Sequence, residues 1–331
     1  MKAKSSAQRH SVEMDGVNLT LKELISYKQQ SLRWLPPAKS LWSQMLGQHQ
    51  SSALGRGMDF AEVRQYQPGD DIRSIDWRVT ARTGKTHTKL YTEEREKPVM
   101  LYIDLSESMR FGSTFMLKSV LASHMAALVS WLSTANNDRV GAVIDLGTQL
   151  IDVKPSARNS GPLKVIQQLV NEHSKLLQKE LLQNGSTKND VNTDNLNSMT
   201  DGLTALNRLC PKGSEIIIIS DFSRFNAHSS ETHNTQTEQE ILLTRLSRHN
   251  RIRLVHVGDP LESGHTQFRG VERVSNRNQT QWFDFSSSKN RKKLKIKFDR
   301  HQASLEKRCR QLGMSYHYLS TDQALVDQVT G

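Results

Sequence analysis

The sequence predicts an α/β fold: a doubly wound, mainly parallel sheet with a small β-rich extension before it. Two apolar runs carry this prediction, residues 99–103 (VMLYI) and residues 214–221 (SEIIIISD). Neither run alternates polar with apolar residues, which is typical of parallel strands covered on both faces. Apolar residues recur at helical spacing between the two runs, so strands and helices alternate along the chain.

Polar side chains follow these predicted strands at the point where each one ends. Asp104 closes the first strand and is followed at alternate positions by Ser106 and Ser108, and Asp221 closes the second. The carboxyl ends of parallel strands share one edge of a sheet, where α/β proteins bind ligands. Oxygen side chains in this pattern suit Mg²⁺. The alternative is that Ser106 or Ser108 caps the next helix while Asp104 accepts backbone N–H bonds.

Length and composition restrict the class of protein. The 331 residues, 36% hydrophobic and 24% charged, are enough for one large domain or two unequal ones. No apolar run approaches a membrane span, and the N-terminus lacks the apolar core of a signal peptide, so we expect a soluble, cytoplasmic protein. Cys210 and Cys309 match no metal or redox spacing and are expected to be buried thiols.

The net charge of +11 raises the question of nucleic-acid binding. Much of the excess lies in one run, Lys289 to Arg300, and no aromatic residues for base stacking alternate with it. Such a run is more often a solvated face. We therefore expect no specific nucleic-acid partner, and only weak binding that ignores base sequence.

Three segments are expected along the chain. Residues 1–46 form a helical lead-in that is partly disordered. Residues 47–97 form a β-rich segment punctuated by glycines and the Pro68-Gly69 turn. Residues 98–331 form the main domain, with a strand-rich insertion near 259–298 and a helix starting at Asp299. The polar stretches 183–197 and 222–239 are expected to be loops, and their order is left open.

The β-rich segment contains a dense signature of glycine, charged and aromatic residues. Its members are Gly55, Gly57, Asp59-Phe60, Arg64, Tyr66, Pro68-Gly69-Asp70-Asp71, Arg73, Ile75-Asp76-Trp77 and Ala81-Arg82. On this signature the chain resembles the domain-of-unknown-function 58 family, in which such a segment precedes a von Willebrand factor A-like domain. The resemblance extends from about Leu21 to Val329.

The resemblance implies a metal-ion-dependent adhesion site that binds Mg²⁺ or, alternatively, Mn²⁺. Asp104, Ser106 and Ser108 match the first loop of that site, and Asp221 matches the third. The second loop departs from the family pattern, because Asn197 stands where the family has a threonine. Asparagine is a neutral oxygen ligand, so this departure weakens the expected site.

The resemblance also implies a non-enzymatic protein-binding module or adaptor. Related proteins accompany MoxR-type AAA+ ATPases and are thought to assemble or activate other protein complexes with them. A bound metal ion with an open position would capture an acidic side chain of the partner. The expected partner-binding residues are Arg64, Asp70, Asp71, Arg73, Asp76, Trp77 and Arg82. An internal ion-pair network around Trp77 is the structural alternative.

Two other functions are left open: a metal-dependent hydrolase acting on phosphoesters, and a weak nucleic-acid binder. The chain has no Gly-x-Ser-x-Gly elbow and no His-Glu-x-x-His pair, and Gly84-Lys85-Thr86 lacks the first glycine of a P-loop. The sequence does not identify the client protein or the oligomeric state.

Overall fold

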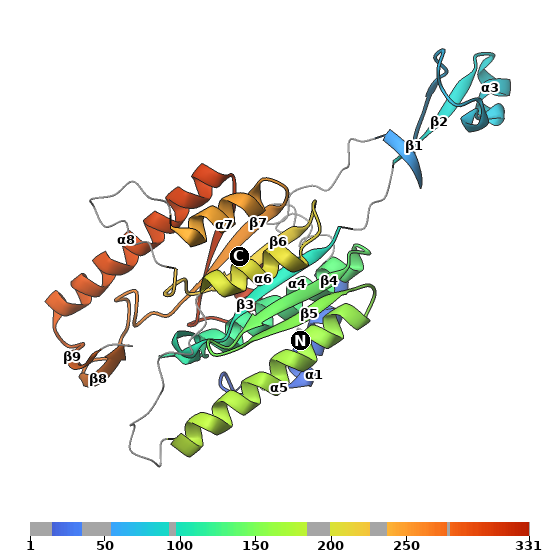
Figure 1. Ribbon diagram of the computed structural model, residues 1–331. Coiled ribbons are helices and arrows are strands. Elements are labelled where there is room, and N and C mark those ends of the chain that lie inside the picture. The colour runs from blue at the N-terminus through green and yellow to red at the C-terminus, as the bar shows by residue number, and fades with distance from the viewer. Residues whose placement is uncertain are drawn as a thin grey trace, which may run out of the picture. The chain divides into compact units, whose positions relative to one another are not determined.

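The structure is a computed structural model that describes residues 15–34, 54–92, 97–183, 199–225, 237–276 and 279–330. The chain divides into two compact units. The large unit consists of residues 1–39 and 97–331, and the small unit of residues 40–96 (Figure 1).

A six-stranded sheet forms the centre of the large unit, in the order β10-β7-β6-β3-β4-β5. All neighbouring strands are parallel except β5, which pairs antiparallel with β4 at one edge. The predicted doubly wound, mainly parallel sheet is therefore confirmed. The strands are β3 (Val99–Asp104), β4 (Val140–Asp145), β5 (Leu150–Ser156), β6 (Glu215–Ser220), β7 (Arg251–Gly258) and β10 (Ser315–Ser320).

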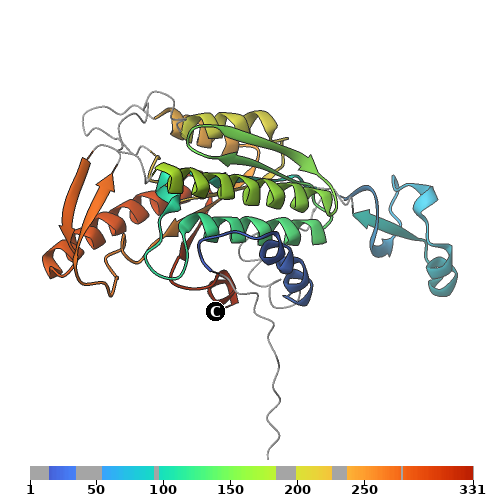
Figure 2. The same cartoon turned by 90° about the horizontal axis from the view of Figure 1, so that it is seen from below.

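Helices cover both faces of this sheet (Figures 1 and 2). One layer contains α4 (Lys118–Ala135), with α5 (Ser160–Gln183) and α1 (Leu21–Trp34) packed on it. The other contains α6 (Met199–Leu209) and α7 (Glu238–Ser247). The short α9 (Leu325–Thr330) contacts α4. Because both faces are covered, every residue of β3, β4 and β6 is buried, which explains their continuous apolar sequence.

The N-terminal helix α1 belongs to the large unit. Leu24 and Tyr27 are buried, and the indole N–H of Trp131 in α4 donates to the Leu24 carbonyl at 3.1 Å. The Tyr27 hydroxyl lies 2.8 Å from Nδ1 of His124, also in α4. The described part of the predicted lead-in is therefore tied to the helical layer.

The small unit is built on two antiparallel strands, β1 (Leu54–Gln65) and β2 (His87–Thr92). Between them the chain forms a 3₁₀ turn (Ile72–Ser74) and the short helix α3 (Trp77–Thr83). The Asp76 carboxylate caps α3 by accepting the N–H groups of Arg78 and Val79. Gly84, with φ of 69°, ends it in the left-handed conformation that glycine favours.

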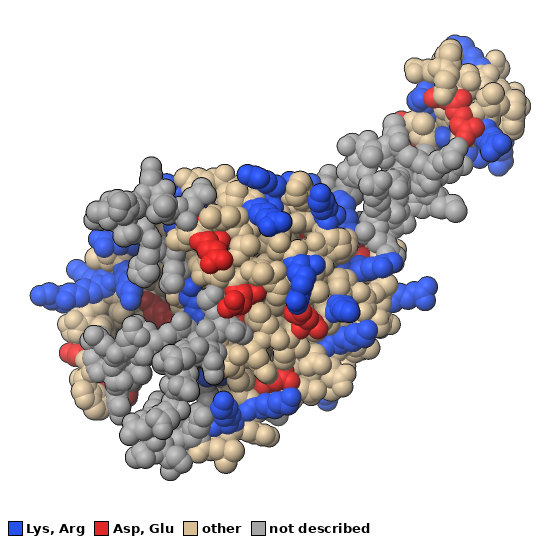
Figure 3. Space-filling view, viewed as in Figure 1, with Lys and Arg blue, Asp and Glu red and all other residues tan. Residues whose placement is uncertain are grey.

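The predicted strand-rich insertion contains an antiparallel pair, β8 (Val271–Asn276) and β9 (Gln279–Asp284), but the helix after it was misplaced. Helix α8 (Ser288–Leu312) begins at Ser288 rather than at Asp299. Lysine and arginine are good helix formers, so the basic run is itself helical. Leu294 and Phe298 lie one turn apart on its half-buried side, and basic side chains project at the left edge of Figure 3, where α8 begins.

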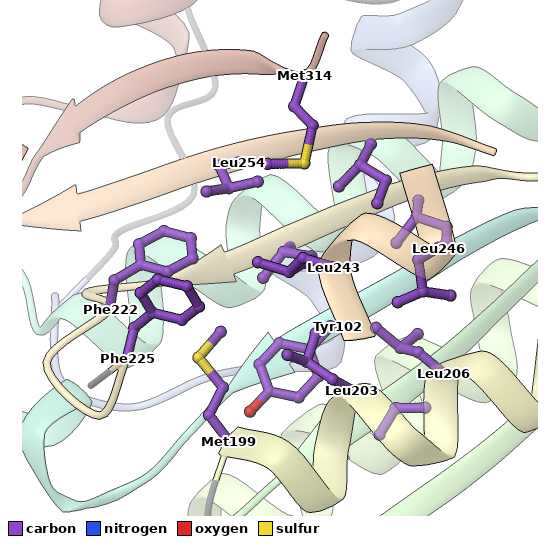
Figure 4. Packing of buried hydrophobic residues seen from close by; sticks show 14 of the residues in the cluster. Tyr102, Met199, Leu203, Leu206, Phe222, Phe225, Leu243, Leu246, Leu254 and Met314 are labelled. Carbon is purple, nitrogen blue, oxygen red and sulfur yellow. The ribbon is translucent and has the colours of Figure 1, made fainter. Parts of the chain in front are cut away.

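The core beneath α6 and α7 depends on one close approach. Tyr102 of β3 is fully buried, and a Cβ atom on Gly202 of α6 would lie 2.3 Å from its ring. Glycine at this position therefore lets α6 lie directly on Tyr102. Figure 4 shows Tyr102 among Met199, Leu203 and Leu206, with the rings of Phe222 and Phe225 at the end of the same cluster.

A helix that crosses a membrane must be both long and apolar. Within the described ranges, no helix has both the length and the apolar composition needed to cross a bilayer.

Candidate functional site

The candidate site lies at the point where the direction of sheet winding reverses. Strand β3 is central, with β4 on one side and β6 on the other. The parallel pairing of β3 with β6 brings Asp104 and Asp221 to the same edge. The Ser220 hydroxyl joins the two strand ends by donating to Oδ2 of Asp104 at 2.7 Å. Open α/β sheets bind ligands at such a point.

Asp104 is enclosed and already paired. It is 1% exposed, and its Oδ1 accepts hydrogen bonds from Nη2 of Arg224 at 2.7 Å and from the Ser106 N–H at 2.9 Å. The same Nη2 lies 2.8 Å from Oδ2 of Asp145, which ends β4. The Tyr102 hydroxyl donates to that oxygen at 2.6 Å. Arg224 therefore bridges the carboxylates that end β3 and β4.

Asp221 has a cation of its own. Nζ of Lys118, at the start of α4, lies 2.9 Å from Oδ2 of Asp221 and 2.7 Å from Oε1 of Glu262. The Lys118 side chain is completely buried, whereas that of Glu262 is 39% exposed. Buried lysines are rare in proteins unless they are paired, as this one is. Oδ1 of Asp221 accepts the N–H of Ser223 at 2.9 Å.

Burial and the surrounding charges shift the protonation of these groups. Burial raises the pKa of Asp104, and the Asp221 and Asp145 carboxylates add to this effect, so that Arg224 offsets it only partly. Burial alone would also raise the pKa of Asp221, but the Lys118 ammonium holds it below its usual range. Burial opposes the charged form of Lys118, yet Asp221 and Glu262 raise its pKa above the ordinary lysine value. Both cations stay charged.

Three serine hydroxyls lie beside these ion pairs. The Ser223 hydroxyl donates to Oγ of Ser108 at 3.0 Å, and Oγ of Ser106 lies 3.5 Å from Oγ of Ser108. Ser106 precedes the 3₁₀ turn Glu107–Arg110 but makes no side-chain capping bond. The capping alternative is therefore wrong for Ser106, whereas the expected acceptance of a backbone N–H by Asp104 is present.

The described oxygens do not fit a resident Mg²⁺. Both oxygens of Asp104 and both of Asp221 already accept hydrogen bonds, and each carboxylate has a buried cation within 3 Å. An octahedral ion bonding these oxygens at about 2.1 Å would lie close to those cations. In the part of the chain that the structure describes, no group of three or more His, Cys, Asp or Glu residues is arranged to hold a metal. Asn197 lies outside the described residues, so metal binding with its help stays a prediction.

Sequence reasoning did not anticipate the residues that pair with these aspartates. Asp145 ends an apolar strand just as Asp104 and Asp221 do, so the same signal could have found it. Arg224 and Lys118 gave no such signal. Arg224 lies in a polar stretch expected to be a loop, and Lys118 begins α4, a helix that is buried along most of its length.

The predicted partner-binding residues of the small unit fall into two groups. Four of them have structural contacts: Arg64 pairs with Asp70 at 2.7 Å, Asp71 accepts the N–H of Arg73, and Asp76 caps α3. The other three, Arg73, Trp77 and Arg82, have exposed side chains. Trp77 is 67% exposed. Arg64 pairs with Asp70, and Nζ of Lys89 lies 3.6 Å from Oδ2 of Asp76 just before Trp77, so the ion-pair alternative stays a prediction. Ile72, which the sequence did not single out, is 66% exposed.

These observations define an α/β protein in which Arg224 and Lys118 occupy the carboxyl edge of the sheet and a small second unit carries exposed signature residues. The chain belongs to the family described as "Protein of unknown function DUF58", whose model matches residues 62–304.

Curated relatives match over limited segments. The uncharacterized protein Rv1480 of Mycobacterium tuberculosis is 38% identical over 107 residues, which are 32% of this chain and 34% of that protein. The uncharacterized protein YeaD of Bacillus subtilis is 36% identical over 69 residues, which are 21% of this chain and 16% of that protein. The chain thus matches about a third or less of the length of these relatives.

Solved structures also match at low identity. BatB from Bacteroides thetaiotaomicron aligns with 70% of this chain and 93% of its own, at 13% identity and a TM-score of 0.38. The SpRpn10 VWA domain aligns with 71% of this chain and 94% of its own, at 12% identity and a TM-score of 0.32.

Proposed function

We propose that this protein is a non-enzymatic protein-interaction module that works in the cytoplasm with a MoxR-type AAA+ ATPase in the assembly or activation of other protein complexes. The class of partner follows from the family resemblance of the signature segment. The exposed signature residues of the small unit support the binding role.

The observation that carries this proposal is the exposure of Ile72 and Trp77. They are 66% and 67% exposed, although large apolar side chains are normally buried. Tryptophan is enriched among the residues that contribute most to protein–protein binding. Both lie in the short stretch between β1 and β2 that matches the family signature. The small unit thus offers apolar contacts where a partner can cover them.

Charge indicates what kind of partner surface fits. Arg73 and Arg82 are exposed in the same stretch of chain as these apolar residues, whereas Asp70, Asp71 and Asp76 hold turns and the start of α3. These three acidic residues are therefore occupied within the unit, whereas Arg73 and Arg82 face solvent. A partner surface with carboxylates around an apolar centre complements this arrangement.

Capture of an acidic side chain through Mg²⁺ at Asp104, Ser106 and Ser108 stays a prediction. It needs an ion with an open position, and the described donors do not fit one. The phosphoesterase alternative would likewise need a metal cluster or a base positioned for attack. The exposed Ile72 and Trp77 therefore favour binding through the small unit.

The test measures binding of the full chain to the purified MoxR-type ATPase of the same organism. Trp77→Ala, Arg73→Ala and Arg82→Ala are compared with wild type. Trp282→Ala is the matched control, because Trp282 lies in the large unit and is 72% exposed. We expect Trp77→Ala to weaken binding about tenfold or more, at an unchanged thermal midpoint.

Arg73→Ala and Arg82→Ala should weaken binding to a smaller degree, and Trp282→Ala should have no effect. If the arginine and Trp77 variants unfold early while their folded fraction binds normally, the signature segment is structural and the proposal fails. Equal binding by all variants and wild type would also reject it.

A further inference from the structure

Four carboxylates meet at the edge of the sheet where the family resemblance expects a metal ion. Asp104, Asp145 and Asp221 end neighbouring parallel strands, and Glu262 comes from the segment after β7. The three aspartates are nearly inaccessible to water, with exposures between 0% and 6%. Buried carboxylates repel one another strongly unless cations compensate them. Positive charge at this edge relieves that repulsion.

We propose that Arg224 and Lys118 supply this charge from within the chain, in place of Mg²⁺, so that the centre holds no resident metal. Arg224 joins the carboxylates that end β3 and β4, with contacts of 2.7 and 2.8 Å. Lys118 joins Asp221 to Glu262, with contacts of 2.9 and 2.7 Å. Each cation thus links two carboxylates from different elements, as a bridging metal ion would.

The backbone conformation and hydrogen bonds around Arg224 fix its position. Phe222 has a φ of 53°, in the left-handed region that bulky residues rarely adopt, and this turns the chain back toward the sheet immediately after β6. The Phe222 N–H donates to the Ser220 hydroxyl, which itself donates to Asp104. The Gln239 side chain, in α7, donates to the Arg224 carbonyl at 3.3 Å. The guanidinium is therefore held over the strand ends at several points.

The position of Lys118 is equally enclosed. It is the first residue of α4, and its N–H donates to the Phe111 carbonyl at 2.8 Å. Its ammonium lies 5.9 Å from the centre of the Phe111 ring. The side chain is fully buried and held by two carboxylates. If it left the edge, the buried Asp221 carboxylate would have no compensating charge.

The remaining donors are poor ligands by themselves. Ser108 and Ser223 offer neutral hydroxyls that already bond to each other. A hard cation prefers carboxylate oxygens, and the buried carboxylates here are bonded to nitrogen cations. Consequently, a partner's acidic side chain would meet hydroxyls and Glu262 at this edge rather than an open metal ion. This inference does not depend on the partner proposed above.

The decisive experiment is a titration of the wild-type full chain with Mn²⁺, followed by electron paramagnetic resonance of the free ion, and with Mg²⁺ by calorimetry. We expect no stoichiometric binding at millimolar metal. The thermal midpoint should be the same with Mg²⁺ and with EDTA. One Mn²⁺ bound with sub-millimolar affinity, and lost in Asp104→Asn, would overturn the proposal whatever any other variant does.

A second measurement tests the role of the internal cation. Arg224→Gln removes the charge beside two buried carboxylates, and Arg208→Gln is its control, because the Arg208 pair with Asp152 is exposed. We expect the midpoint of Arg224→Gln to fall by several degrees, or the variant not to fold, while Arg208→Gln matches wild type. If Arg224→Gln is as stable as Arg208→Gln, internal charge compensation is refuted.

Discussion

Arg224 and Asp104 lie 120 residues apart in the sequence, yet Nη2 of one is 2.7 Å from Oδ1 of the other. Their side chains are only 3% and 1% exposed. This ion pair lies where a family resemblance expects a metal ion, at the reversal point of the sheet. The Asp-x-Ser-x-Ser pattern is therefore present, but its carboxylate is already paired with a cation of the same chain.

The first prediction concerns the second buried cation. Lys118→Met should lower the free energy of unfolding by about 3–5 kcal/mol, because it leaves the Asp221 carboxylate buried without a compensating cation. Lys118→Met combined with Asp221→Asn should recover part of this loss, since the uncompensated charge is then gone. Urea unfolding measures both variants.

Lys175→Met is the control for this prediction, because Lys175 also contacts a carboxylate, that of Glu172, but its side chain is 68% exposed. Its cost should stay below about 1 kcal/mol. A Lys118→Met protein as stable as Lys175→Met would show that the buried bridge contributes nothing to folding.

The second prediction concerns the contact between α6 and β3. Gly202→Ala should destabilise the protein by about 1–3 kcal/mol, because its Cβ would lie 2.3 Å from the Tyr102 ring. Alanine is the better helix former, so the loss has to come from packing. Thr204→Ala, an exposed change in the same helix, should have little effect. A thermal melt of both variants decides, and a Gly202→Ala protein that is more stable than wild type contradicts the packing.

The third prediction concerns pH. Burial lowers the pKa of His124 to about 4, so the folded protein keeps this ring neutral while the unfolded chain protonates it near the ordinary histidine value of 6.5. The unfolded state then binds more protons between these values, and stability is lost as the pH falls from about 6.5 to about 4. His124 contributes at most about 1.4 kcal/mol per pH unit.

Urea unfolding at pH 5 and pH 7 checks this prediction. His173, whose pKa burial also lowers to about 4, should contribute in the same direction. His124→Gln should therefore flatten the pH dependence without abolishing it. An identical slope in wild type and His124→Gln would show that this ring does not titrate on unfolding.

The fourth prediction concerns the basic surface of α8. Lys292, Lys293 and Lys295 are exposed, and we expect them to support only weak duplex binding that disappears at physiological salt. Replacing the three by glutamine should remove the low-salt binding. The same change at Lys164, Lys175 and Lys179, exposed on α5, should not. Sequence-selective binding that survives physiological salt would overturn this view.

Much of the sheet follows directly from the sequence. The runs ending at Asp104 and Asp221 are apolar throughout because helices cover both faces, so their pattern predicted buried parallel strands. Parallel strands place their carboxyl ends together, which is why the meeting of Asp104 and Asp221 could also be predicted. The basic run of α8 was harder, because charge masks the helical spacing of Leu294 and Phe298.

Only the tertiary structure decided what surrounds those aspartates and which signature residues face solvent. A charged side chain is expected at the surface, so the local sequence did not indicate that Lys118 and Arg224 would be buried against carboxylates from distant strands. Trp77 was equally ambiguous, because tryptophan fits a core and a binding surface alike. By itself the sequence determined which apolar runs form buried parallel strands and the edge where their aspartates meet. Long-range packing determined the charge at that edge and left Trp77 exposed, since both depend on contacts between segments far apart in the chain.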